Sequence, residues 1–218
     1  MPLRLALLFQ HGNFVGREYA AALAAAGHSA LLIAAGSFSE ASRTREEQRT
    51  GGLWQPPPLP AWPQHRFAAL EDPALWALLR EAGTDLAIQG GVGLLTPAMI
   101  AVPRLGILNV HPGRLPDYRG SACPEWALLN GDPVVATAHL VDAGLDTGPV
   151  VCARPYPVAP GTPYVRIRAG LYAHCAATLL EAIDLLERHG AGIAVPQPAG
   201  GRRWPPLPAE KLAMLLAR

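Results

Sequence analysis

The 218-residue sequence lacks the features that mark several large classes of protein. It contains no continuous apolar run near the ~20 residues that a membrane-spanning helix requires. Its net charge is only +1, and its densest basic cluster is Arg202–Arg203. Proteins that grip a phosphate backbone usually carry a basic stripe, so we expect neither a nucleic-acid nor a membrane partner. The three cysteines are widely spaced and form no metal or disulfide pattern, so we expect no metal site and a cytoplasmic location.

The apolar start of the chain predicts a strand rather than a signal peptide. Residues 4–10 are followed at once by polar residues, and no small-residue cleavage site ends the apolar run. An alanine-rich helix is expected over 15–26 and a continuously apolar strand over 29–34. Such a strand–helix–strand opening is typical of an α/β fold with a doubly wound, Rossmann-like and mostly parallel sheet.

Later segments continue this alternation of helices and strands. Half of the residues are hydrophobic, which suffices for one large domain. We expect the main domain to cover 1–189 and a short C-terminal extension to cover 190–218. The expected helices are 73–82, 97–101, 124–130, 163–189 and 209–216, and the expected strands are 85–89, 106–111, 134–141 and 148–156. Thr162–Pro163 is expected to cap the longest helix.

Residues 36–64 interrupt the pattern. Residues 37–50 are polar and charged, so they predict either a surface helix or a disordered loop. Residues 54–63 carry five prolines and predict a stiff extended segment. We favour a covering loop over one edge of the sheet, with a ligand for a proline-binding domain as the alternative.

A polar pair ends the strand expected at 106–111. Asn109 and His111 point to the same face because side chains alternate along a strand. Open α/β sheets bind their ligands at such strand ends. An amide beside an imidazole can stabilise negative charge on a carbonyl oxygen, and an acidic loop with Asp142 and Asp146 follows. No serine or cysteine is placed as a nucleophile, so these residues suit direct attack of an amine on an acyl donor.

Two motifs in this region resemble the signature of the folate-dependent formyltransferases. They are Asn-Val-His-Pro-Gly-Arg-Leu-Pro-Asp-Tyr-Arg-Gly at 109–120 and Asp-Ala-Gly-Leu-Asp-Thr-Gly at 142–148. The resemblance implies the family's catalytic trio at Asn109, His111 and Asp146, with Asp146 keeping His111 charged. It also implies 10-formyltetrahydrofolate as the co-substrate that donates the formyl group. Residues 1–189 would then form the formyltransferase catalytic domain.

The resemblance further implies that two loops hold the pterin of this donor. Glycines in the first loop allow the backbone to approach a flat heterocycle, and the leucines can pack on its face. The expected donor contacts are Gly91, Val92, Gly93, Leu94 and Leu95 in the first loop, with Asp142, Gly144 and Leu145 in the second.

The acceptor is expected to be a small-molecule amine, with an amino sugar or a specialised metabolite as examples. About seventy residues follow Asp146, which leaves little room for the tRNA-binding domain of methionyl-tRNA formyltransferase. At residues 10–16, the sequence departs from the phosphate-binding loop of glycinamide ribonucleotide formyltransferase. His11, Gly12 and Asn13 in this stretch are the expected acceptor contacts. Alternatives are glycinamide ribonucleotide formyltransferase, a 10-formyltetrahydrofolate hydrolase and a non-catalytic folate-binding protein. The apolar helix expected at 209–216 is compatible with packing against a second copy in a homodimer.

Overall fold

A seven-stranded sheet forms the centre of the protein, in the order β3-β2-β1-β4-β5-β7-β8. The computed structural model describes residues 2–217. Strands β1 to β5 run parallel, and β7 and β8 are antiparallel to their neighbours. This arrangement confirms the expected doubly wound, mostly parallel sheet. The strands are β1 (Leu5–His11), β2 (Ala30–Ser37), β3 (Gln64–Phe67), β4 (Leu86–Gln89), β5 (Ile107–His111), β7 (Val135–Leu140) and β8 (Val150–Pro155).

The direction of winding reverses between β1 and β4. The chain first builds outward through β2 and β3, and then returns to add β4, β5, β7 and β8 on the other side of β1. A crevice at the carboxyl ends of the strands is expected at such a reversal, since the loops diverge there. The short strand β3 was not expected from the sequence, because its four residues are mostly exposed and show no apolar pattern.

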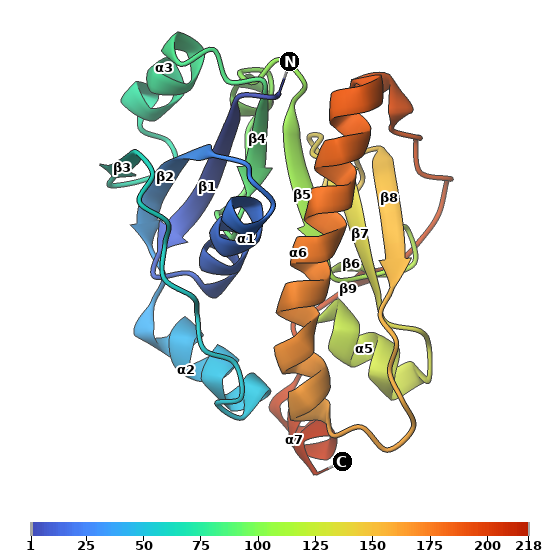
Figure 1. Ribbon diagram of the computed structural model, residues 1–218. Coiled ribbons are helices and arrows are strands. Elements are labelled where there is room, and N and C mark those ends of the chain that lie inside the picture. Colours follow the sequence, from blue (N-terminus) through green and yellow to red (C-terminus); the bar gives the residue numbers. More distant parts are fainter. Residues whose placement is uncertain (1, 218) are drawn as a thin grey trace.

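Helices cover both faces of the sheet because the strand side chains alternate between two apolar clusters. On β1, Leu5, Leu7 and Phe9 pack with α1 (Phe14–Ala25) and α6 (Tyr164–His189), which Figure 1 shows side by side in front of the strands. Ala6 and Leu8 pack toward α3 (Pro73–Glu81) and α4 (Pro97–Ile100). The other helices are α2 (Glu40–Thr50), α5 (Cys123–Asn130), the short 3-10 helix η1 (Ala191–Ile193) and α7 (Ala209–Leu216).

Local capping sets where several helices begin. The Asn13 side chain accepts from the Val15 amide at the start of α1, and Asp72 accepts from Ala74 at the start of α3. The cap expected at Thr162 is wrong. No side chain caps α6, and the Thr162 hydroxyl donates instead to the carbonyl of Ala159.

By length and composition alone, helix α6 is long and apolar enough to cross a membrane. Half of its most apolar stretch is buried inside the fold. Its apolar side includes Leu171, Leu179 and Ile183, which belong to the main core beside the sheet. We therefore describe α6 as a core helix of the α/β domain.

Within the polar segment 37–50, residues Glu40–Thr50 form helix α2 rather than a disordered loop. The proline-rich segment that follows packs on helices. The ring of Trp54 stacks on Tyr172 at 4.4 Å, and its indole nitrogen donates to Glu18. Leu59 and Trp62 pack against the main core. Residues 54–63 thus act as a covering segment over α1 and α6, and the segment ends beside β2, where the amide of Leu32 donates to the carbonyl of Pro63.

The C-terminal segment returns to the end of β5. Strand β9 (Arg203–Trp204) pairs with β6 (Arg119–Gly120) in a separate two-stranded sheet that the sequence did not predict. Trp204 is buried, stacks on Tyr118 and lies 5.0 Å from Trp126 between ring centroids. The domain division at residue 189 stays a prediction. Met214 of α7 is exposed, and a second copy covering it stays a prediction too.

Candidate active site

The ends of β4, β5 and β7 bring the predicted polar residues together. In the pairing of β5 with β7, Asn109 lies opposite His139 and His111 lies opposite Thr137. Both pairs share one face because side chains alternate along each strand. Asn109, His111 and His139 border an open cleft of about 630 Å³. The cleft is lined by Gln89, residues 91–95, Asn109, His111, Gly120, His139, residues 141–146 and Arg203.

Asn109 is held by His139. The amide nitrogen of Asn109 lies 3.1 Å from Nε2 of His139 and donates to it, since an amide nitrogen cannot accept. The other ring nitrogen, Nδ1, lies 3.2 Å from the carbonyl of Leu140 and therefore carries the proton. Burial lowers the pKa of His139 to about 4, with the neighbouring His111 acting in the same direction. His139 is thus a neutral acceptor that fixes the Asn109 amide and leaves its second hydrogen for the cleft.

His111 is fixed between a backbone carbonyl and a carboxylate. Its Nε2 donates to the carbonyl of Tyr118 at 2.7 Å, and its Nδ1 lies 3.6 Å from Oδ2 of Asp146. Burial lowers the pKa of His111, and this effect outweighs Asp146 and the Tyr118 bond, which both raise it. The expectation that Asp146 keeps His111 charged is therefore wrong for the ligand-free site near pH 7. The imidazole there is neutral, with an Nδ1 that can take a proton beside the carboxylate.

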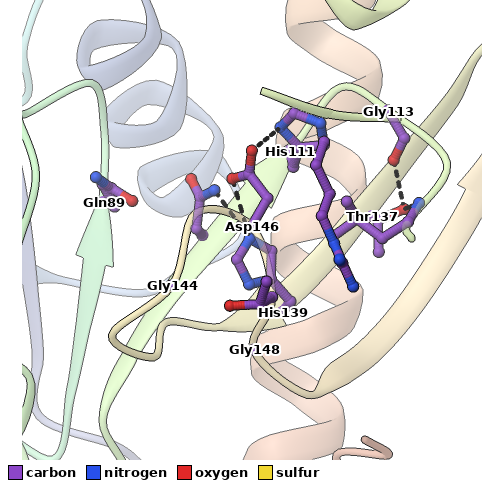
Figure 2. A network of polar contacts seen from close by, with 12 residues as sticks. Gln89, His111, Gly113, Thr137, His139, Gly144, Asp146 and Gly148 are labelled. Atoms are coloured by element: carbon purple, nitrogen blue, oxygen red, sulfur yellow. Dashed lines mark hydrogen bonds and ion pairs between the residues drawn. The ribbon is translucent and has the colours of Figure 1, made fainter. Parts of the chain in front are cut away.

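Asp146 lies between the two histidines, as Figure 2 shows. Its Oδ1 is 3.8 Å from Nε2 of His139, and the amide of Gly120 donates to its Oδ2 at 2.8 Å. The backbone of Asp146 has a φ of +54°, a left-handed conformation that side chains rarely adopt. A Cβ at Gly148 would lie 1.8 Å from the carbonyl oxygen of Leu140, so only glycine lets this loop fold back so tightly on β7.

The two loops expected to bind the donor face each other across the cleft. Gly91 has a φ of +90°, and a Cβ there would meet the side chain of Asn13 at 2.4 Å. Gly93 has no atom within 4 Å of an added Cβ, so there is open space beside it, and its carbonyl accepts from the side chain of Gln89 at 3.2 Å. Leu94 is 81% exposed at the rim. In the second loop, Asp142 accepts from the amide of Gly144 and from the hydroxyl of Thr147.

The predicted acceptor residues divide between two positions. Asn13 is buried, and its amide donates to the carbonyl of Gly91 at 3.2 Å, so it links the β1–α1 turn to the first loop. His11 and Gly12 line a second cavity of about 570 Å³ beside this link. That cavity is lined by His11, Gly12, Phe14, Arg17, Ser37, Phe38, Arg43, Glu47, Gly52, Trp54, Gln55 and Pro56.

Cys123 is the thiol nearest this chemistry. It is 1% exposed, and burial raises its pKa to about 12, with Asp146 and Glu125 adding to the shift. A neutral, buried thiol is a poor nucleophile. The arrangement therefore agrees with the expectation of direct transfer without a covalent enzyme intermediate.

Several residues of the site were not predicted from the sequence. His139 lies outside the predicted catalytic trio, although its alternation with Thr137 in the strand expected at 134–141 already placed both side chains on one face. Thr137 is buried and donates to the carbonyl of Gly113, which ties down the loop after β5 (Figure 2). Gln89 and Gly120 line the cleft, and Arg203 reaches it from a segment that the sequence suggested was a tail.

Proteins named as formyltransferases are similar to this chain in sequence and in fold. The "Formyl transferase" family model matches residues 17–182. A methionyl-tRNA formyltransferase from Deinococcus radiodurans is 37% identical over 131 residues, which cover 59% of this chain and 41% of that protein. Across such curated relatives, the chain spans between 31% and 56% of their length.

Solved structures share the fold at lower identity. Glycinamide ribonucleotide transformylase 1 from Symbiobacterium toebii has a TM-score of 0.64 at 23% identity, covering 93% of this chain and 92% of that one. The formyltransferase PseJ from Anoxybacillus kamchatkensis, in complex with UDP-4,6-dideoxy-4-formamido-L-AltNAc and tetrahydrofolate, has a TM-score of 0.54 at 22% identity, covering 81% and 85%. With most of its length matched by the family model, this chain belongs to the formyl transferase family.

Proposed function

We propose that this protein transfers a formyl group from 10-formyltetrahydrofolate to the amine of a small molecule. The meeting of Asn109, His111 and Asp146 at one cleft carries this proposal. We also propose that it works in the cytoplasm, which is consistent with three unpaired cysteines.

The main cleft has features that suit a folate. Its volume of about 630 Å³ falls in the range of small-molecule sites. One wall offers open space beside Gly93 and the exposed side chain of Leu94, which suit the close approach and the flat face of a heterocycle. The opposite wall is the backbone of residues 142–145. The donor supplies a formyl carbon bonded to a nitrogen that can leave.

In the proposed reaction, the cleft residues stabilise the charge that develops on the formyl oxygen. The amine nitrogen attacks the formyl carbon, and the free hydrogen of the Asn109 amide donates to the oxygen. Asp146 orients a water that takes the proton of the attacking amine, and His111, neutral at rest, holds this proton on Nδ1 beside Asp146. The same proton then passes to the departing nitrogen. The bond from the formyl carbon to that nitrogen then breaks.

The second cavity is the proposed site for the recognition group of the acceptor. It is lined by three aromatic side chains, Phe14, Phe38 and Trp54, and by Arg17 and Arg43. Strand β4 separates β1 from β5, and neighbouring strands lie about 4.8 Å apart. The acceptor would therefore place its amine roughly 10 Å from an aromatic or anionic group held in this cavity.

Methionyl-tRNA is the second candidate acceptor, because the curated relatives are methionyl-tRNA formyltransferases. A net charge of +1 gives little long-range attraction for tRNA, so the small amine remains our proposal. Glycinamide ribonucleotide and nucleotide-linked amino sugars are included as small acceptors, because each joins an amine to an anionic group that Arg17 and Arg43 would attract.

The experiment measures consumption of 10-formyltetrahydrofolate by the purified protein with a panel of acceptors. The panel contains glycinamide ribonucleotide, nucleotide-linked amino sugars and methionyl-tRNA. Turnover that needs a small amine supports the proposal, and turnover only with tRNA supports the second candidate. Turnover without any amine indicates a hydrolase, and donor binding without turnover in any arm indicates a folate-binding protein.

A further inference from the structure

The loop that carries Asp146 is held by a residue from outside the matched part of the family model. Gln197 lies in the segment between η1 and β9, whereas the family match ends at residue 182. Its side-chain nitrogen donates to the carbonyl of Asp146 at 2.9 Å and to the carbonyl of Gly148 at 2.8 Å. Both amide hydrogens are therefore used on the two ends of one tight turn.

This turn needs an external support. Asp146 is a non-glycine residue in the left-handed region, a strained conformation that persists only where surrounding contacts hold it. The Gly120 amide fixes the carboxylate of Asp146, while Gln197 fixes its backbone carbonyl. Together they define the position of Asp146 between His111 and His139.

Arg119 fixes the orientation of the Gln197 amide. The guanidinium donates to the side-chain oxygen of Gln197 through Nη2 at 2.8 Å and through Nε at 3.3 Å. Because a guanidinium can only donate, the oxygen must face Arg119 and the nitrogen must face the two carbonyls. A third bond, from Nη1 of Arg119 to the carbonyl of Gly200, anchors the guanidinium itself.

We propose that Gln197 is a positioning residue for formyl transfer, acting through the Asp146 turn without touching either substrate. Gln197 is not among the residues that line the main cleft. This inference rests on the proposed function only for its kinetic test, since the NMR test described below needs no turnover.

The principal test is Gln197→Glu, which preserves the shape of the side chain and its acceptor for Arg119. It replaces the donor to both carbonyls with an oxygen that repels them. We expect kcat to fall about 10- to 100-fold, as displacement of a catalytic group by about 1 Å can cause. The KM for the formyl donor should stay within about twofold, because Asp142 still holds residues 142–145 by accepting from the Gly144 amide and the Thr147 hydroxyl.

Gln48→Glu is the matched control, since it adds the same charge at an exposed position of α2. It should leave kcat and KM unchanged. Arg119→Gln is the second variant, which keeps Gln197 but frees its amide to rotate. It should lower kcat in the same direction, and the two changes combined should cost less than the product of their separate effects.

A readout independent of activity comes from the histidine ring signals in NMR titrations. Asp146 raises the pKa of His111, so a displaced Asp146 should leave that pKa lower in Gln197→Glu than in the wild type. An unchanged kcat, or a fall in kcat that matches the loss of folded protein for both variants, overturns the inference. If the wild type turns over no acceptor, the proposed function fails, and an unchanged His111 titration then overturns the inference separately.

Discussion

Each side chain of the trio owes its position to a specific neighbour. His139 holds the Asn109 amide, the Tyr118 carbonyl holds His111, and the Gly120 amide holds the Asp146 carboxylate. Fixed donors and charges act on a developing oxyanion without reorganising, which is the main source of catalysis in such sites. The site therefore depends on buried neighbours as much as on the trio.

His139 gives a prediction about stability and pH. Its pKa in the folded protein is about 4, below the ordinary 6.5, so the unfolded chain binds a proton more readily. The resulting stability is fully present above pH 6.5 and is lost as the pH falls toward 4. His139→Gln keeps an acceptor for Asn109 but has no imidazole to protonate. As the pH falls toward 4, its free energy of unfolding should therefore decrease by up to about 3 kcal/mol less than that of the wild type.

The measurement is the free energy of unfolding of both proteins by urea denaturation at pH 7.5, 6, 5 and 4. The variant should lose less stability than the wild type over this range, because His111 still contributes its own part. Parallel curves for the two proteins would contradict the assignment of a buried, neutral His139.

At the scale of elements, α2 is joined to α6 by buried charges. Glu46 accepts from Arg168 at 2.7 Å and from the hydroxyl of Tyr172 at 2.6 Å, and it pairs with Arg49 at 2.9 Å. Glu125 of α5 is 1% exposed and faces both guanidinium groups, at 3.4 Å and 3.9 Å. This network places α2, and with it one wall of the second cavity, against the core.

Glu46→Ala should destabilise the protein by about 3 kcal/mol, because it leaves buried guanidinium charge with one carboxylate fewer. Glu47→Ala is the control on the same helix, and its exposed side chain predicts a change within about 0.5 kcal/mol. Urea unfolding of the two variants measures the difference. Equal stabilities would show that the network does not anchor α2.

The elements differ in how well the sequence predicted them. Apolar strands and capped helices were expected close to their observed bounds, since periodicity and local capping determine them. The pairing of Asn109 with His139 could not be predicted, because it depends on the register of two strands that are 30 residues apart in sequence. Helix α2 was left undecided because charged partners on α5 and α6, rather than an apolar stripe, hold it.

At the scale of the whole molecule, the reversal of winding between β1 and β4 places two cavities at the carboxyl ends of the parallel strands. The Asn13–Gly91 bond lies between them, and the trio lies in one of them only. This arrangement separates the proposed recognition of the acceptor from the proposed transfer of the formyl group. The C-terminal segment packs at the same end of the sheet, where β9 pairs with β6, although its composition alone suggested an appendage.

The central claim is that the trio stabilises the transition state of formyl transfer. The most direct measurement is the single-turnover rate of Asn109→Ala and His111→Ala, with the acceptor found in the panel and with donor binding measured in parallel. Each variant should be slower by about 10²-fold or more while binding the donor within a few-fold of the wild type. His65→Ala, at an exposed position of β3, should be unchanged. Wild-type rates in His111→Ala would contradict the account.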